Sequence, residues 1–300
     1  MTDLGELRPL LFSIAYRMLG SVADAEDVVQ ETHLRYEQAI ADGAVIESPK
    51  AYLSAVATRL AIDELRSARR RRENYSGQWL PEPLLTDDGD DDPALAAEQS
   101  DSLSMAFLLL LERLGPVERA VFLLHDVFGY EHREIAQIVD RTEANCRQLA
   151  RRARQRVHEE RPRFDTSRAE RARLAERFFA AVGDGDVDGL VELLAADVAV
   201  YGDGGGKTPQ WSRPIVGADH VSRLFANLGR QLRERRGVIE LHEVNGQPGA
   251  LVRAPDGKLI NVFVLDVTDG AIQTVRSVIN PDKLQHLGPV ADVWALLRRT

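Results

Sequence analysis

A chain of 300 residues, with 44% hydrophobic and 28% charged residues, has the composition of a globular protein and is long enough for two or three domains. It has no run near the ~18 apolar residues of a membrane-spanning helix, and its acidic N-terminal stretch predicts no secretory signal. Cys146 is the only cysteine, which excludes an internal disulfide and indicates a reducing, cytoplasmic location. The net charge of -9 argues against nucleic-acid binding over the whole surface, so a DNA-binding face has to be sought locally.

The N-terminal quarter is predicted to be helical. Residues 6–40 carry apolar side chains at spacings of three and four, interrupted at Gly20, and a further helix begins at Pro49 and ends near residue 72. Residues 74–102 lose this periodicity and contain three prolines and a run of aspartates. We interpret them as an exposed, acidic linker.

Residues 130–157 have the pattern of a helix-turn-helix. Thr142 is a plausible N-cap for the second helix. One face of that helix is apolar, with Cys146, Leu149, Ala150, Ala153 and Val157. The side chains available for DNA are Asn145, Arg147, Gln148, Arg151, Arg152 and Arg154.

Residues 141–163 contain eight arginines and three acidic residues, a local excess of five positive charges. The alternative is a surface helix with solvated arginines, but the cap, the preceding helix and the two-sided pattern favour DNA contact. Cys146 lies on the apolar face, so we interpret it as core packing and not as a nucleophile or ligand.

Residues 168–300 change in texture. An amphipathic helix is followed by short β-branched runs, with turn signals such as Asn245-Gly246 and Asp269-Gly270 between them. This order predicts a compact α+β domain. Its histidines and aspartates, Asp219, His220 and His242 among them, lack the spacing of a metal site, and no cofactor is expected.

The N-terminal pattern distinguishes between classes of DNA-binding protein. DAEDVVQETHLRYEQA at 24–39 resembles the conserved second-region helix of sigma factors, and residues 49–72 are similar to the helix that follows it. Residues 103–160 resemble the fourth region, and the intervening linker is typical of the extracytoplasmic-function (ECF) group. The expected domains are region 2 (1–73), the linker (74–102), region 4 (103–163) and a SnoaL-like domain (168–300).

The resemblance implies two partners, core RNA polymerase and promoter DNA. The acidic helix would dock on the polymerase clamp coiled coil through Asp24, Glu26, Asp27, Gln30 and Glu31. Helix-start acids that favour the macrodipole would explain Asp24 to Asp27 but not Gln30 and Glu31. Region 4 would read the –35 element and contact the polymerase flap.

In the family, the third helix and the loop at about 41–49 melt and read the –10 element. The cations that would contact this DNA are Lys50, Arg59, Arg66, Arg69, Arg70, Arg71 and Arg72. For Arg69 to Arg72, the alternative is a solvated helix end that favours the macrodipole.

The order of elements after residue 168 resembles the SnoaL-like, NTF2-like fold, a cone of helices and curved sheet around a cavity. Three motifs resemble those of the sigma group with this extension: Trp79-Leu80-Pro81-Glu82-Pro83, Asp203-Gly204-Gly205-Gly206-Lys207 and Asn280-Pro281-Asp282-Lys283. The resemblance implies a built-in regulator, and the cavity is a candidate site for a small ligand.

Each motif has an alternative reading. The glycines could form a flexible turn, and the motif is too short for a P-loop. The Asn-Pro-Asp-Lys segment could simply end a strand. We expect both to touch the linker around Trp79, with Lys207 and Lys283 facing the linker aspartates.

The sequence therefore predicts a sigma factor without catalysis of its own, regulated in cis by its C-terminal domain. One alternative is a DNA-binding regulator whose C-terminal domain binds a small ligand or has cyclase-like or isomerase-like activity. Another is a repressor-like protein that never meets polymerase.

Overall fold

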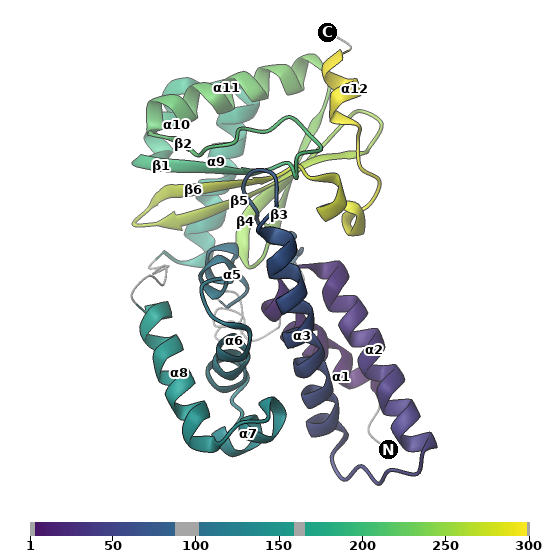
Figure 1. Ribbon diagram of the computed structural model, residues 1–300. Helices are drawn as coiled ribbons and strands as arrows, with labels where there is room; N and C mark the ends of the chain where they lie inside the picture. The colour runs from purple at the N-terminus through teal and green to yellow at the C-terminus, as the bar shows by residue number, and fades with distance from the viewer. Residues whose placement is uncertain (1–3, 88–101, 159–165, 299–300) are drawn as a thin grey trace. The chain divides into compact units, whose positions relative to one another are not determined.

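The computed structural model describes residues 4–87, 102–158 and 166–298, which divide into two compact units (Figure 1). The helical unit is drawn from Met1–Asn74 and Phe107–Arg161, and the α+β unit from Tyr75–Ala106 and Pro162–Thr300. From Tyr75 onward, the described residues of the predicted linker therefore belong to the α+β unit. Among the described helices, none has the length and apolar character needed to cross a membrane.

The helices of the first unit follow the predicted order. They are α1 (Leu4–Leu19), α2 (Val22–Ala41), α3 (Pro49–Arg72), α5 (Met105–Leu111), α6 (Pro116–Phe122), the π-helical turn η1 (Leu123–Val127), α7 (His132–Val139) and α8 (Glu143–His158). The break at Gly20 is confirmed, because Gly20 has a φ of 66° and the Ser21 hydroxyl caps α2 by accepting from the N–H of Asp24 at 3.1 Å. The helix-turn-helix is also confirmed, with Asp140 in the left-handed conformation at the turn.

Regions that the sequence placed in separate domains share one unit, because α3 packs against α6 and α7. A buried charge cluster contributes to this packing. Arg119, only 1% exposed, donates to the carbonyl of Met18 at 2.7 Å and to Glu112 Oε1 at 2.8 Å. Arg72 also pairs with Glu112 and donates to the carbonyl of Leu19 at 2.5 Å. Two helical segments distant in sequence are thus linked through one carboxylate.

The ionisation of this cluster favours the folded state. Burial lowers the pKa of Arg119 to about 10, which leaves the guanidinium charged at neutral pH. Burial alone would raise the pKa of Glu112, but the charges of Arg119 and Arg72 outweigh it and hold that pKa below its ordinary value.

Replacing Glu112 with Gln should lower the free energy of unfolding at pH 7 by up to about 3 kcal/mol, because both guanidiniums lose their counter-charge while the amide oxygen still accepts one hydrogen bond. The folded pKa of Glu112 is depressed, so its contribution is complete above the unfolded pKa of about 4.3 and is lost as pH falls through the folded value. Urea denaturation, followed by far-UV circular dichroism, should therefore give a difference in the free energy of unfolding between wild type and variant that becomes smaller as the pH falls. A difference that is the same at every pH would contradict this account.

The α+β unit contains helices and one six-stranded sheet. Its elements are α9 (Arg168–Asp184), α10 (Val187–Leu193), β1 (Leu194–Asp203), β2 (Ile215–Val216), α11 (Ala218–Glu234), β3 (Val238–Val244), β4 (Gln247–Arg253), β5 (Leu259–Thr268), β6 (Ala271–Val278), the 3₁₀ turns η2 (Pro281–Lys283) and η3 (Gln285–Leu287), and α12 (Val293–Arg298). The strand order is β2-β1-β6-β5-β4-β3; β1 and β6 are parallel and the other neighbours are antiparallel. The predicted α+β class is confirmed.

Two hairpin turns have the predicted chemistry. Asn245 and Gly246 join β3 to β4 with φ of 53° and 67°, and Asp269 and Gly270 join β5 to β6 with φ of 53° and 71°. Two successive left-handed residues match the right-handed twist of the strands they connect. These turns fix the register of the β3–β6 meander.

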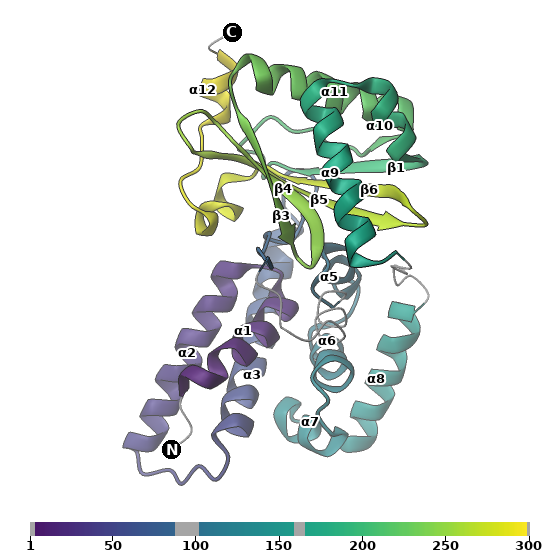
Figure 2. The same cartoon turned by 180° about the vertical axis from the view of Figure 1, so that it is seen from behind.

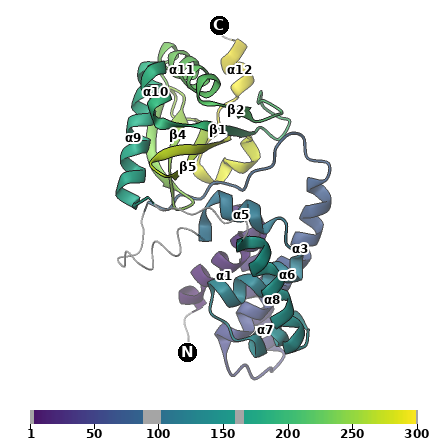
Figure 3. The same ribbon diagram turned by 90° about the vertical axis from the view of Figure 1, so that its left-hand side faces the viewer.

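Helices α9, α10 and α11 cover one face of the sheet, and α12 lies beside the end of α11 on that same side (Figures 2 and 3). Phe178 and Phe225 contact edge-to-face with centroids 5.1 Å apart, and Phe225 reaches Phe263 of β5 at 5.4 Å. A Cβ on Gly229 of α11 would lie 1.7 Å from the carbonyl oxygen of Val182 in α9, so only glycine allows this approach. The helices are therefore held tightly over the sheet.

Candidate nucleic-acid interface and linker-binding site

The second helix of the helix-turn-helix, α8, presents the predicted two faces. Its N-cap is Thr142, whose hydroxyl accepts from the N–H of Asn145 at 3.2 Å. Four of the five predicted apolar residues are buried, whereas Leu149 is half-buried, and burial raises the pKa of the Cys146 thiol, as expected for core packing. The exposed side chains are Arg147, Gln148, Arg151, Arg152 and Arg154, with Asn145 half-buried.

These arginines differ in how far they are engaged. Arg147 pairs with Glu143 one turn earlier, Arg154 pairs with Asp126, and Arg152 lies 3.9 Å from Glu118. Arg151 is exposed and has no ion pair or side-chain hydrogen bond to any described residue. Arg151 can therefore bind a phosphate or a base without first breaking an ion pair to a described residue.

The cations of α3 fall into two groups. Arg59 donates to the carbonyls of Ile138 and Gln137, both at 2.8 Å, and Arg69 donates to the carbonyl of Glu112 at 2.7 Å. With Arg72, these side chains connect α3 to the segment of α5–α7, although Arg59 is still exposed. Their contact with promoter DNA stays a prediction. Lys50, Arg66 and Arg70 are exposed, and the side chain of Arg71 lies outside the described part.

The acidic side of α2 is largely as expected. Asp27 and Gln30 are exposed, Asp24, Glu26 and Glu31 are half-buried, and Glu26 and Glu31 pair with Arg8 and Arg35. Val28 and Val29 pack inward. Leu34 does not, because its position turns it outward, where it is 53% exposed.

The three motifs of the predicted regulatory surface meet around one buried carboxylate. Asp203 is fully buried at the end of β1. Its Oδ2 accepts from the N–H of Leu80 at 2.8 Å and from Lys283 Nζ at 2.7 Å, and its Oδ1 accepts from the hydroxyl of Tyr75 at 2.6 Å. The linker is therefore bonded to both motifs of the extension through its backbone as well as its side chains.

The buried Lys283 completes this cluster, which we call the linker clasp: Tyr75, Trp79, Leu80, Asp203, Asn280 and Lys283. The Lys283 ammonium lies 4.5 Å from the centroid of the Trp79 ring and 5.0 Å from that of Tyr75, and it also donates to the carbonyl of Leu80. Burial, and then the bond to Asp203, raise the pKa of the Tyr75 hydroxyl, which stays protonated and donates. Asn280 Nδ2 donates to the same hydroxyl at 2.8 Å.

Steric crowding explains why glycine occupies two positions of the second motif. Gly205 and Gly206 have φ of 59° and 71°, and the N–H of Gly205 donates to Asp203 Oδ1 at 3.1 Å. A Cβ on Gly205 would lie 2.3 Å from Asn280 Nδ2, and one on Gly206 would lie 2.9 Å from Cβ of Ser76. The loop is a close-fitting wall of the clasp and not a free turn.

The rest of the described linker follows the α+β unit. Leu80, Pro81, Glu82 and Pro83 are buried, and the carbonyl of Pro83 contacts His286 Nε2 at 2.7 Å. Leu85 forms an antiparallel bridge with Val244, next to Leu84, whose N–H donates to Asn245 Oδ1 at 3.0 Å. Residues 75–87 thus dock on the α+β unit, mostly without regular secondary structure, and residues 80–83 are buried where composition suggested an exposed linker.

The expected pairing of the two lysines with linker aspartates is wrong for Asp87, the one aspartate of the acidic run that the structure describes. Lys283 pairs with Asp203, and Lys207 pairs with Asp282, both within the extension. Asp87 instead accepts from the N–H of Glu243 and contacts His242, both at 2.6 Å. The remaining aspartates of the acidic run, at 88, 90, 91 and 92, lie outside the described residues.

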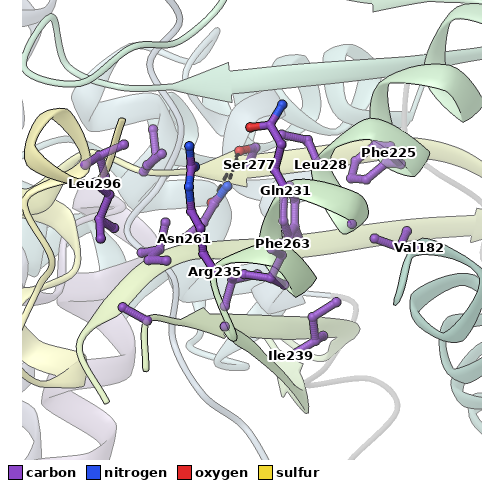
Figure 4. Close-up of a pocket in the computed structure, with 18 of the residues that line it drawn as sticks. Val182, Phe225, Leu228, Gln231, Arg235, Ile239, Asn261, Phe263, Ser277 and Leu296 are labelled. Atoms are coloured by element: carbon purple, nitrogen blue, oxygen red, sulfur yellow. Dashed lines mark hydrogen bonds between the residues drawn. The ribbon is translucent and has the colours of Figure 1, made fainter. Parts of the chain in front are cut away.

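A largely apolar cavity of about 290 Å³ lies between α11 and the sheet (Figure 4). Its walls include Phe179, Val182, Trp211, Phe225, Leu228, Leu232, Arg235, Ile239, Asn261, Phe263, Ser277, Val293 and Leu296. Asn261 Nδ2 donates to the Ser277 hydroxyl at 2.8 Å, which also accepts from Gln210 Nε2 at 3.1 Å. No group of three or more potential metal ligands is found among the described residues.

Some functional residues escaped the sequence reasoning. Tyr75 precedes the tryptophan motif by only four residues, so its position could have suggested a role. Glu112 and Arg119 have no local signal, because their burial depends on contacts across the helical unit. Helix α11 was also missed, although Val221, Phe225 and Leu228 have helical spacing.

The comparisons with known proteins agree with this geometry. Sigma-70 region 2 matches residues 4–71, and Sigma-70 region 4 matches residues 104–157. The chain is 37% identical over 292 residues to the ECF RNA polymerase sigma factor SigJ of Mycobacterium tuberculosis, covering 94% of this chain and 92% of SigJ. The probable ECF RNA polymerase sigma factor SigI of the same organism is 33% identical, with 93% of each chain covered.

The fold comparison is equally broad. The crystal structure of Mycobacterium tuberculosis SigJ superposes with a TM-score of 0.73 at 35% identity, over 96% of this chain and all of that one. Similarity of this extent includes both sigma regions, the linker and the α+β domain. The chain therefore belongs to the extracytoplasmic-function family of RNA polymerase sigma factors.

Proposed function

We propose that this sigma factor is regulated by its own α+β domain through the linker clasp. The linker connects region 2 to region 4, and a sigma factor that reads two promoter elements needs a defined path between them. The observation that carries the proposal is the buried Asp203–Lys283 pair, which holds Tyr75, Trp79 and Leu80 of that linker. Docking or release of the linker would bias the arrangements that regions 2 and 4 can adopt.

The polymerase and promoter contacts are proposed in more detail from the exposed faces. The α2 face with Asp27, Gln30 and Glu31 is suited to the clamp coiled coil, and region 4 to the flap. The α8 face would read the –35 element, and the loop before α3 the –10 element. These activities belong in the bacterial cytoplasm, where transcription takes place.

We also propose that the α+β domain is not an enzyme. General acid–base catalysis needs a titratable side chain within reach of the substrate. Among the described residues lining the cavity, none is Asp, Glu, His, Lys, Cys or Tyr, and the charged one is Arg235. This composition supports binding, and not cyclase or isomerase chemistry.

The α8 face can be tested with the triple variant Arg147→Ala, Arg151→Ala and Arg152→Ala. A guanidinium that forks onto a guanine should contribute about 1–3 kcal/mol and its loss should relax specificity at that base, whereas lost phosphate contacts should weaken all sequences alike. Promoter binding by the reconstituted polymerase, measured on –35 variants, separates these cases. Unchanged –35 recognition would remove α8 from the interface.

Two neighbours on α3 give a matched comparison. Arg70 is exposed and has no ion pair among the described residues, whereas Arg69 donates to backbone carbonyls after α5. Arg70→Ala should reduce –10 binding and leave the unfolding curve unchanged, because it loses only solvent-facing donors. Arg69→Ala should lower stability by about 1–3 kcal/mol, since it leaves buried carbonyls unpaired. The opposite pattern would reverse the roles assigned to them.

The clasp can be tested with Asp203→Asn, using Asp282→Asn as its control. Removing the buried charge breaks the ion pair between Asp203 and Lys283 and should weaken linker docking by about 3–5 kcal/mol. The exposed Lys207–Asp282 pair should contribute only about 0–1 kcal/mol. Hydrogen exchange at the N–H of Leu80 should therefore accelerate strongly in the first variant and little in the second.

Run-off transcription with core polymerase measures the functional consequence. Asp203→Asn should change promoter output several-fold, and Asp282→Asn should not. Adding Lys283→Met to Asp203→Asn should recover part of the lost docking, because no charge is then left buried. If Asp203→Asn accelerates hydrogen exchange at Leu80 but leaves transcription unchanged, the clasp does not regulate this sigma factor.

A further inference from the structure

We propose that the cavity of the α+β domain binds a small carboxylic acid with an apolar body, and that Arg235 holds its carboxylate. This inference deepens the proposed regulatory function and rests on it for its biological meaning. The binding itself follows from the charge, size and polarity of the cavity walls.

The charge that the lining residues carry is positive and is not balanced by a carboxylate in the wall. Arg235, which follows α11, is half-buried and has no ion pair or side-chain hydrogen bond to any described residue. No carboxylate is found among the described lining residues that could neutralise it. A guanidinium beside an apolar volume attracts an anion more strongly than it would in water, and its planar fork matches a carboxylate.

The polar groups of the cavity wall lie together, and the rest of the wall is apolar. In Figure 4 Arg235 is drawn with Asn261 and Ser277, while Val182 and Phe225 lie farther along the cavity. Trp211 also lines the cavity, and its indole N–H is buried with no hydrogen-bond partner among the described residues. A ligand with an oxygen-rich end and an apolar remainder matches this wall.

The size of the ligand is limited. A volume of about 290 Å³ is at the lower end for sites of small molecules, so the ligand is smaller than a typical drug. A medium-chain fatty acid or a short aryl-alkanoic acid satisfies both the volume and the polarity. A large polar metabolite such as a nucleotide would leave most of its groups against phenylalanine and leucine side chains.

Helix α12 connects this site to the clasp. Val293 and Leu296 line the cavity, and Trp294 between them donates its indole N–H to the carbonyl of Lys207 at 2.9 Å. Lys207 belongs to the glycine-rich loop whose Gly205 packs against Asn280. A ligand that moves or orders α12 therefore acts on a wall of the clasp.

The test uses octanoate and 4-phenylbutyrate as probes, with their neutral amides as matched ligands, in calorimetric titrations of the full chain. Both acids should bind with a dissociation constant on the order of 1 mM or below, as ligand efficiencies allow for molecules of this size. Arg235→Gln should weaken the acids at least tenfold and change the amides by less than twofold. Arg230→Gln, an exposed arginine on α11 outside the cavity wall, should change neither.

The location is tested separately. Ile239→Trp, which fills the cavity, should abolish binding of acids and amides alike, and thermal unfolding checks that this variant is folded. In ¹⁵N-labelled protein, octanoate should shift the indole resonances of Trp211 and Trp294, each assigned from a Trp→Phe variant. No saturable binding of either acid, equal affinity in Arg235→Gln, or binding without a shift of Trp211 would each overturn the proposal.

Failure of this inference is distinguishable from failure of the proposed function. If Asp203→Asn alters transcription but neither acid binds, the clasp regulates and the cavity assignment is wrong. If the acids bind through Arg235 and Asp203→Asn has no effect on transcription, the ligand site stands and the regulatory role of the clasp is wrong.

Discussion

The structure of the α+β domain and its hold on the linker depend on one buried ion pair, Asp203 with Lys283. Isolated charges are costly to bury, so such a pair persists only when hydrogen bonds satisfy the remaining donors and acceptors. Here Leu80 and Tyr75 of the linker supply them. The linker is therefore part of the solvation of the pair, and the domain without it would leave a carboxylate and an ammonium incompletely bonded.

This dependence makes linker docking closer to a switch than to a gradual loosening. Once Leu80 leaves, Asp203 loses one backbone donor and Lys283 one carbonyl acceptor at the same time. Partial detachment would leave the Asp203 carboxylate and the Lys283 ammonium each short of a hydrogen bond, which costs free energy. It would not yet regain the conformational entropy of the whole linker segment. A docked and a released linker are consequently favoured over intermediate arrangements, as a two-state regulator requires.

Much of the fold could be predicted from the sequence, because helical spacing, the Thr142 cap and the Asn245-Gly246 and Asp269-Gly270 turns are local signals. The apolar face of α8 and the meeting of three short motifs around Trp79 were likewise accessible from residue types and resemblance. The partners within the clasp were not: charge complementarity suggested that lysines would face linker aspartates, whereas burial selected Asp203. The use of Arg59, Arg69 and Arg72 within the helical unit was also hidden, because an arginine-rich helix end looks the same whether it faces DNA or backbone carbonyls.

The parallel pairing of β1 with β6 has a consequence for how this domain can diversify. Asp203 pairs in register with Val278, so the chain leaves both strands at the same sheet edge, and the N–H groups of Ile279 and Asn280 donate to the carbonyl of Asp203. The segment from α11 to β5, loops included, supplies most of the cavity wall and is inserted between these two strands in the sequence. Under the two proposals above, substitutions there would change which ligand the cavity accepts without altering Asp203, Asn280 or Lys283, so that one architecture could couple different ligands to the same linker clasp.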